Sequence, residues 1–313
     1  MIAYTIKRLG QSIAVLLGVV FVVFFISHLL PGGARALIGA QANPAVVKQF
    51  YAANGYNKPL WTQFILYLGR LLRGDLGYSY SYNAPVSSLL AQALPKTALM
   101  VGLAYLIGLV VALPLGVVQA VRRNKPIDYL LTSGSLVAYS MPQFWLGLLL
   151  ILYFAIHLGL LPPEAPQGAT IGAVLGDPKA LVLPVCTLAA GTVAVFGRFM
   201  RSSALEELVQ DYVRTARGKG MAERRVLFGH VVRNAILPTI TLIGLSLPGV
   251  LSGAVVVESL FNYPGMGLLF WKAAVVHDFP VLLGFTVVVA AATVIGSVIA
   301  DLLYGVADPR VRV

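Results

Sequence analysis

Long apolar runs separated by short polar segments dominate the chain. Six runs reach the length of a membrane-crossing helix, which needs about 20 mostly apolar residues. We therefore expect an all-α integral membrane protein with six passes. The first run is too long for the apolar core of a secretory signal, so it is expected to be a pass. The runs cover residues 9–30, 98–121, 129–157, 180–197, 236–257 and 281–305.

The composition agrees with this prediction. Of the 313 residues, 58% are hydrophobic and 11% are charged. Soluble domains carry about 25% charged residues. The mean hydropathy is +0.84. These values exclude a soluble enzyme, a disordered tail and a nucleic-acid-binding domain, although the net charge is +11.

The positions of lysine and arginine predict the orientation. If the N-terminus is cytoplasmic, 15 of the 23 cations fall in inside segments, although the outside segments are longer in total. By the positive-inside rule, both termini and the segment 198–235 are expected in the cytoplasm. The segment 31–94 is then extracytoplasmic.

The predicted passes contain several prolines, including Pro114, Pro142, Pro184 and Pro248. In lipid, a missing backbone donor is tolerated only where neighbouring helices compensate, so we expect local kinks in a tightly packed bundle. The single cysteine, Cys186, excludes an internal disulfide framework. It is expected to be a small buried apolar residue.

The outside segment 31–94 is expected to contain two helices. One would begin after Asn43 at Pro44, and the other would extend from Pro59 to Gly74 with apolar residues at helical spacing. The second helix has two interpretations: it packs on the rim of the bundle, or it forms part of a docking surface for an extracytoplasmic partner. The candidate docking residues are Trp61, Arg70, Arg73 and Asp75.

The inside segment 198–235 contains eight of the 15 inside cations. Leu205, Leu208, Tyr212 and Ala216 are spaced as one apolar helical stripe, and glycines at 218 and 220 should end the helix. A helix lying on anionic lipid headgroups fits this pattern. Docking into a cytoplasmic protein fits it as well.

No catalytic or metal-binding constellation is found. The chain has no G-x-x-x-x-G-K-[ST] phosphate loop, no H-E-x-x-H and no G-x-S-x-G. Its four histidines lack metal-ligand spacing. The membrane interior is nearly free of ionisable groups apart from Glu258 and Asp301 near the ends of passes, which argues against an ion-coupled transporter. Energy for transport would come from another subunit.

Five blocks of residues are distinctive together, in order and nearly end to end. The blocks are Tyr4–Leu9 with Leu30–Gly32, Asn57–Val86, Leu94–Thr97, Asp211–Gly220 with Arg233–Pro238, and Glu258–Gly267 with Asp301–Tyr304 and Asp308–Arg310. The second block contains the core Gly74-Asp75-Leu76-Gly77-Tyr78-Ser79. Together the blocks resemble the first-permease type of the permease subunits of peptide-type ABC importers, the dipeptide, oligopeptide, nickel and glutathione permease family.

This resemblance implies one domain, residues 1–313, with the six-helix fold of a type I ABC importer and an extracytoplasmic insertion between passes one and two. It implies half of a heterodimeric pore in a bacterial or archaeal cytoplasmic membrane. The implied partners are a homologous second permease, two ATPase subunits or one fused pair, and an extracytoplasmic binding protein. This chain would be no enzyme and hold no cofactor, because ATP and magnesium would bind the ATPase subunits.

The fourth block resembles the peptide-permease form of the EAA loop that contacts the ATPase. The general motif has a glutamate in its first triplet, and in this chain residues 214–216 occupy that triplet without a glutamate. Elsewhere, Gly33 stands where the family often has an acidic residue. Three cations of the block would supply charge complementarity, and its last glycine a turn. The implied coupling residues are Asp211, Tyr212, Val213, Arg214, Thr215, Ala216, Arg217, Gly218, Lys219 and Gly220.

Three functional hypotheses follow. The chain would form part of an ATP-driven importer of di- or oligopeptides, or of an importer of the same class that carries nickel chelates or glutathione. From a different class, it would be a passive channel or membrane scaffold that functions without ATPase partners. Intramembrane proteolysis lacks a catalytic constellation.

Overall fold

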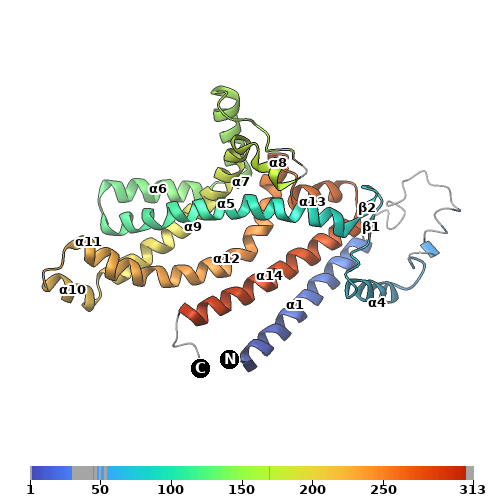
Figure 1. The fold of residues 1–313 in the computed structure, drawn as a ribbon, viewed down its shortest axis with the longest axis horizontal. Coiled ribbons are helices and arrows are strands. Elements are labelled where there is room, and N and C mark those ends of the chain that lie inside the picture. Colours follow the sequence, from blue (N-terminus) through green and yellow to red (C-terminus); the bar gives the residue numbers. More distant parts are fainter. Residues whose placement is uncertain are drawn as a thin grey trace.

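The computed structural model describes residues 2–29, 45, 48, 51–52, 55–168 and 170–307. Long helices form a bundle, with short helices at its ends and along one side and one small hairpin at one end (Figure 1). The helices are α1 (Ile2–Leu29), α4 (Leu60–Leu71), α5 (Val86–Val121), α6 (Pro126–Ser140), α7 (Gln143–Leu150), η1 (Ile151–His157), α8 (Ile171–Leu175), α9 (Pro178–Leu208), α10 (Asp211–Gly218), α11 (Glu223–Val226), η2 (Leu227–Val231), α12 (Val232–Leu260), α13 (Met266–Val275) and α14 (Phe279–Ala307), where η1 and η2 are π-helices.

A two-stranded antiparallel hairpin is the exception to the all-α prediction within the described residues. It pairs β1 (Tyr78–Ser79) with β2 (Ala84–Pro85). The hairpin lies at the end of the bundle where α5 begins and α14 begins, whereas α10 and α11 lie at the opposite end (Figure 1). We call these the hairpin end and the α10 end.

Three helices in the described residues are long and apolar enough to cross a membrane. They are Val86–Val121, Pro178–Leu208 and the part Phe279–Ser297 of α14. A fourth is added if the bent pair Pro126–Ser140 and Gln143–His157 is one span. Helices α1 and α12, of 28 and 29 residues, cover the predicted first and fifth passes.

The predicted third pass over 129–157 is divided between two helices, and the kink expected at Pro142 is a sharp bend. The chain bends by 107° between α6 and α7. Pro142 stands at the bend and Met141 before it has an extended backbone, with φ −80° and ψ 127°. A proline disfavours the helical conformation of the residue before it, so the helix ends there. By contrast, Pro114 and Pro184 lie inside α5 and α9.

Helices α5 and α9 approach closely through small residues. A Cβ added at Gly116 would lie 2.5 Å from the carbonyl oxygen of Gly197 and 2.8 Å from the Cβ of Met200. One added at Gly108 would lie 2.6 Å from the Cβ of Thr192. Gly108, Ala112 and Gly116 are small residues at four-residue spacing, which allows such backbone contact in membrane helices.

Replacing Gly116 by alanine should therefore force the two helices apart. We expect the free energy of unfolding to fall by about 1–3 kcal/mol, the usual cost of overpacking. Gly102 on α5 is the matched control, because a Cβ there meets nothing within 4 Å. Thermal unfolding in detergent should show a clear loss for G116A and none for G102A; equal midpoints for the two variants would contradict this packing.

Helix α4 packs on the bundle at the hairpin end. Phe64 and Tyr67 of α4 are buried in one cluster with Val20 and Phe24 of α1 and Leu283 of α14. The predicted helix from Pro59 to Gly74 is confirmed. It packs on the rim of the bundle, as the first of its two interpretations expected. The predicted helix after Pro44 lies outside the described residues for most of its length.

Cys186 is exposed on α9, which corrects the prediction that it is buried. In a membrane-spanning helix, positions that face the protein core and positions that face lipid are both apolar. Residues on either side of Cys186, such as Val185 and Thr187, are buried. The apolar run alone therefore did not distinguish the two faces.

Candidate functional site

The segment resembling an ATPase-contacting loop forms a compact cap at the α10 end. Val213 and Ala216 of α10 are buried in one apolar cluster with Val226, Val231 and Ala235 from the segments that follow. These contacts fix α10 on the ends of the long helices. Two of the ten predicted coupling residues thus face the interior of the chain.

The end of α10 is fixed by a glycine turn. Gly220 has φ +75°, a conformation that glycine adopts without strain. Its backbone N–H donates to the carbonyl oxygen of Arg217 at 2.9 Å, and the N–H of Met221 donates to that of Ala216 at 3.3 Å. These two bonds form a Schellman motif. The predicted turn at Gly220 is confirmed.

An ion pair closes the same turn. The Nη2 and Nε atoms of Arg217 donate to the two carboxylate oxygens of Glu223, at 2.6 and 3.1 Å. The guanidinium holds the pKa of Glu223 below its ordinary value of 4.5. The stability that the ion pair contributes is fully present above pH 4.5. It is lost as the pH falls through the lowered pKa that Glu223 has in the folded chain. Both side chains are well exposed, so the pair contributes little at neutral pH.

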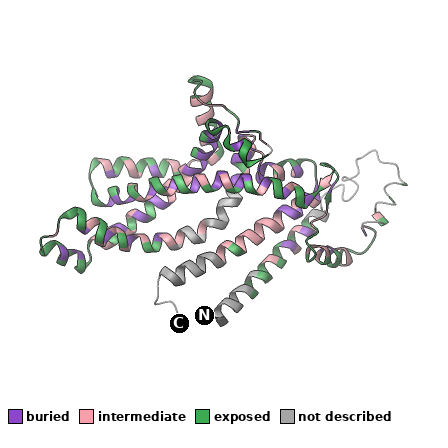
Figure 2. Cartoon of the chain, viewed as in Figure 1, coloured by how far each residue is buried: buried purple, intermediate pink, exposed green. Residues whose placement is uncertain are grey.

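The remaining coupling residues face outward. Arg214 lies 3.5 Å from Asp211 in an exposed pair, and the hydroxyl of Tyr212 accepts a hydrogen bond from Nδ2 of Asn234 at 2.9 Å while donating to Glu207. Figure 2 shows the outer side of α10 as mainly exposed. We define the α10 surface by its exposed residues, which are Asp211, Tyr212, Arg214, Thr215, Arg217, Gly218, Lys219 and Gly220.

The predicted apolar stripe through Tyr212 needs correction, since Val213 rather than Tyr212 is buried. The stripe assumed one continuous helix from Leu205 to Ala216. In the structure α9 ends at Leu208 and α10 begins at Asp211, and the break shifts the helical phase.

A partly buried ion pair braces the bundle near the α10 end. Asp128 at the start of α6 accepts two hydrogen bonds from Arg201 of α9, each at 3.0 Å, and one from the backbone N–H of Asn124 at 3.1 Å. The Asp128 side chain is 3% exposed. This pair could not be predicted from the sequence, because the two residues are 73 positions apart.

A second polar centre lies at the hairpin end and joins two of the distinctive sequence blocks. Glu258 near the end of α12 is fully buried. Its Oε1 accepts from Oγ1 of Thr97 on α5 at 2.6 Å. Its Oε2 accepts from the backbone N–H groups of Gly267 and Leu268 at 2.6 and 3.2 Å. We call this network, with Met266, the Glu258 clamp.

The clamp caps the N-terminus of α13. Thr97 Oγ1 also accepts from the backbone N–H of Met266 at 2.8 Å, so three first-turn donors of α13 are satisfied. A carboxylate at this position also complements the helix dipole. Gly267 is required, since a Cβ there would lie 2.4 Å from Cα of Val255.

The hairpin joins the same end through another buried carboxylate. Oγ of Ser79, in the Gly74–Ser79 core, donates to Oδ2 of Asp278 at 2.5 Å. Oδ1 of Asp278 accepts from the backbone N–H of Val281 at 3.4 Å, which caps α14. The hairpin is thereby fixed to the start of the last long helix.

The four predicted docking residues lie on or after α4 at the hairpin end. Trp61 is 61% exposed and its ring packs near those of Phe21 and Phe25. Arg73 and Asp75 are exposed and Arg70 is half-buried. The Oδ1 atom of Asp75 accepts from the backbone N–H of Gly77 at 2.9 Å.

Within the described residues, no group of three or more histidine, cysteine, aspartate or glutamate side chains is arranged to hold a metal ion. The polar centres found here consist of hydrogen bonds and ion pairs between helices. Their arrangement fixes the two ends of a membrane-crossing bundle.

Comparison with known protein families identifies the chain. Residues 112–313 match the family described as binding-protein-dependent transport system inner membrane component, and residues 1–101 match the N-terminal model described for the same kind of membrane component. The chain belongs to this family.

Relatives of this transport-system component extend over its full length. The oligopeptide transport system permease protein AppB of Bacillus subtilis is 39% identical over 315 residues, covering 100% of both chains. The oligopeptide permease OppB of Haemophilus influenzae is 34% identical, again over 100% of both chains. The dipeptide permease DppB of Escherichia coli K12 is 32% identical over 100% of this chain and 99% of its own.

Solved structures share the fold of this inner membrane component. An inward-facing structure of the MetNI methionine ABC transporter has a TM-score of 0.56 and 14% identity, covering 71% of this chain and 97% of that one. A crystal structure of an amino acid ABC transporter with histidines has a TM-score of 0.52 and 18% identity, covering 72% and 95%. The fold is that of ABC transporter membrane domains.

Proposed function

We propose that this chain is a membrane-spanning permease subunit of an ATP-driven importer of di- or oligopeptides. The observation that carries the proposal is the rigidly held, exposed α10 surface on a chain whose full-length relatives are named oligopeptide and dipeptide permeases. The chain would pair with a homologous second permease, two ATPase subunits or a fused pair, and an extracytoplasmic binding protein. ATP and magnesium would bind the ATPase subunits.

In this proposal both termini and the α10 end face the cytoplasm of a bacterium or archaeon. The distribution of 15 inside and 8 outside cations supports this orientation. The hairpin, α4 and α13 then lie on the extracytoplasmic side. Residues 31–94 form the extracytoplasmic segment, and 198–235 form the coupling loop.

The α10 surface would insert into a groove on one ATPase subunit. Closure of the ATPase dimer around ATP would then draw the cytoplasmic ends of the passes together and open the pore outward. Hydrolysis would return the inward-facing state. Such coupling requires a helix that transmits motion without deforming and that contacts the ATPase differently in the two states. The buried Val213 and Ala216 and the turn at Gly220 give α10 that rigidity.

Trp61, Arg70, Arg73 and Asp75 would contact the binding protein. Because α4 packs on α1 and α14, deleting the segment would expose aromatic side chains of α1 and aliphatic ones of α14. A point variant is therefore the better test. Arg73→Glu should weaken binding-protein docking about fivefold, as for one charge near an interface, whereas Arg123→Glu at the opposite end should not. Equal docking by both variants would refute this role.

Co-purification tests the importer against the passive channel. The chain expressed with its candidate partners should be recovered in mild detergent with the second permease and the ATPase subunits. A chain that conducts substrate without any ATPase would instead be a channel or scaffold. Nickel chelates and glutathione are the alternative cargoes of the same importer class, and competition with labelled peptide distinguishes them.

A further inference from the structure

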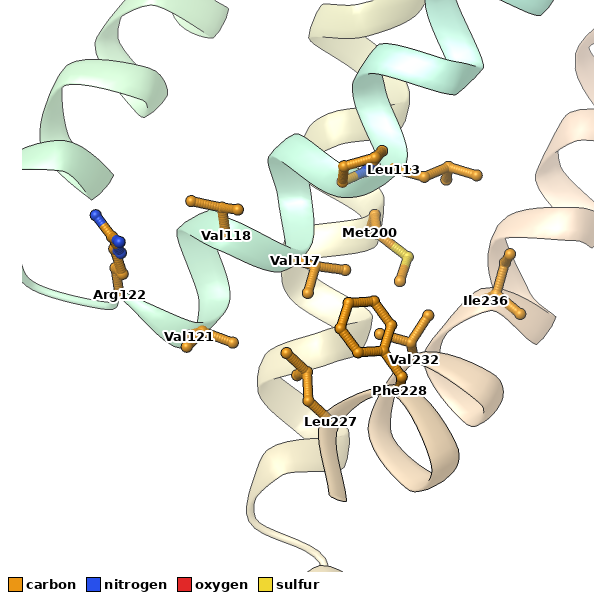
Figure 3. Close-up of a pocket in the computed structure, with 11 residues that line it drawn as sticks. Leu113, Val117, Val118, Val121, Arg122, Met200, Leu227, Phe228, Val232 and Ile236 are labelled. Atoms are coloured by element: carbon orange, nitrogen blue, oxygen red, sulfur yellow. The ribbon is translucent and has the colours of Figure 1, made fainter. Parts of the chain in front are cut away.

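An apolar groove lies between the last turns of α5 and the beginning of α12 (Figure 3). Its volume is about 280 Å³. Val117 and Val118 of α5 form one wall, and Phe228 of η2 with Ile236 of α12 forms the other. Arg122 is the charged residue of its lining. An extended peptide would leave its backbone groups unpaired here, whereas a hydrocarbon chain would not.

Arginines line both the groove and the open hollow beside it. Phe228 also lines a second, open hollow of about 580 Å³ together with Arg224 and Arg225. These two arginines and Arg122 are exposed, and none forms a salt bridge with another described residue. The nearby carboxylates are engaged elsewhere: Asp128 binds Arg201, and Glu223 binds Arg217. The groove is therefore apolar along its length and has arginines beside it whose charge is not neutralised by a described carboxylate.

The depth of the groove matches one leaflet of a bilayer. From Leu113 to Val121, α5 rises about 12 Å. Half of a hydrocarbon core of about 30 Å is of similar depth. Arg122 follows at the end of α5, the level at which headgroups would lie. A π-helix, a feature that often marks functional sites, carries the Phe228 side chain, which is 60% exposed.

We propose that this groove binds an anionic phospholipid of the cytoplasmic leaflet. One acyl chain would lie between Val118 and Phe228, and the phosphate would lie near Arg122, Arg224 and Arg225. Basic sites between membrane helices on the cytoplasmic side are suited to anionic headgroups. The inference rests on the membrane orientation in the proposed function, but it does not depend on the transported substrate.

Lipid retention by the purified full-length chain tests the proposal. Native mass spectrometry would compare phosphatidylglycerol with phosphatidylcholine of the same acyl chains. We expect phosphatidylglycerol to be retained preferentially. Arg122→Gln should weaken it about fivefold, which corresponds to ~1 kcal/mol per cation near a membrane surface. Arg123→Gln, which removes an equal charge outside the groove, should change it less than twofold.

Filling the groove should have the same effect as removing the charge. Val118→Trp should reduce phosphatidylglycerol retention by filling the groove. Phe228→Ala, at an exposed position, removes part of the opposite wall and should also reduce retention, which provides a second test if the first variant fails to fold. Equal retention of the two lipids, or equal effects of the two arginine variants, would overturn the proposal.

Two further outcomes would also overturn it. If inorganic phosphate displaces the lipid and neither groove variant matters, the arginines form a simple phosphate site. If the isolated chain retains the lipid but the assembled importer does not, a partner subunit covers the groove. If the wild-type complex retains the lipid but does not transport peptide, the proposed function is refuted and the lipid site stands.

Discussion

Replacing Glu258 by alanine is expected to have the largest effect of any single substitution outside the α10 surface. The change leaves the Thr97 hydroxyl and the backbone N–H groups of Gly267 and Leu268 without their acceptor. A buried donor without a partner costs about 1–3 kcal/mol, so we expect the free energy of unfolding to fall by about 3 kcal/mol. Thermal unfolding in detergent measures this loss of stability. Peptide uptake should also fall below a tenth of the wild-type rate.

Two variants control this experiment. Glu258→Gln keeps an acceptor for the α13 backbone and should have a much smaller effect. Ser259→Ala removes a neighbouring hydroxyl that bonds only to the carbonyl oxygen of Val255 in its own helix, and it should be nearly neutral. An unchanged unfolding midpoint for Glu258→Ala would show that the clamp does not hold α5, α12 and α13 together.

Reversing the charge of Arg214 is expected to weaken ATPase docking and so to reduce the ATP hydrolysis that the binding protein stimulates. Arg214 is exposed on the α10 surface, and its pairing with Asp211 is weak. Placing a like charge against a partner surface costs several kcal/mol, so Arg214→Glu should lower binding-protein-stimulated ATP hydrolysis at least tenfold. Because the side chain makes no buried contact, the unfolding midpoint should remain that of the wild type.

Ala216→Glu and Arg123→Glu separate coupling from folding. Ala216 lies on the buried face of α10, so its replacement should lower the stability of the chain itself. Arg123 lies on the exposed turn between α5 and α6, and its reversal should leave hydrolysis within twofold. If an intact complex that contains the Arg214→Glu variant hydrolyses ATP at the wild-type rate, the α10 surface is excluded as the coupling site.

The sequence predicted local features better than it predicted pairings. The helix from Pro59 to Gly74 was predicted from apolar spacing, because that signal lies within one element. The turn at Gly220 followed from glycine itself. The break at Pro142 was anticipated only as a kink, since a proline inside a helix and a proline at a bend have the same local signature.

The polar centres required the fold. Thr97 and Glu258 belong to blocks that the sequence singled out, but their separation of 161 residues gave no sign that they bind each other. The ion pair of Asp128 with Arg201 was hidden in the same way. The apolar stripe failed at Tyr212 because the break between α9 and α10 was not anticipated. In each case, tertiary contacts decide which of several compatible partners a residue meets.

ATP-dependent peptide accumulation tests the central claim most directly. Vesicles would carry the complete complex with ATP inside and the binding protein outside, and labelled di- and oligopeptides would be compared with nickel and glutathione. We predict accumulation of peptide only when ATP is present. Uptake of nickel or glutathione alone would keep the importer and change its cargo. Equal peptide fluxes with and without ATP would contradict the account.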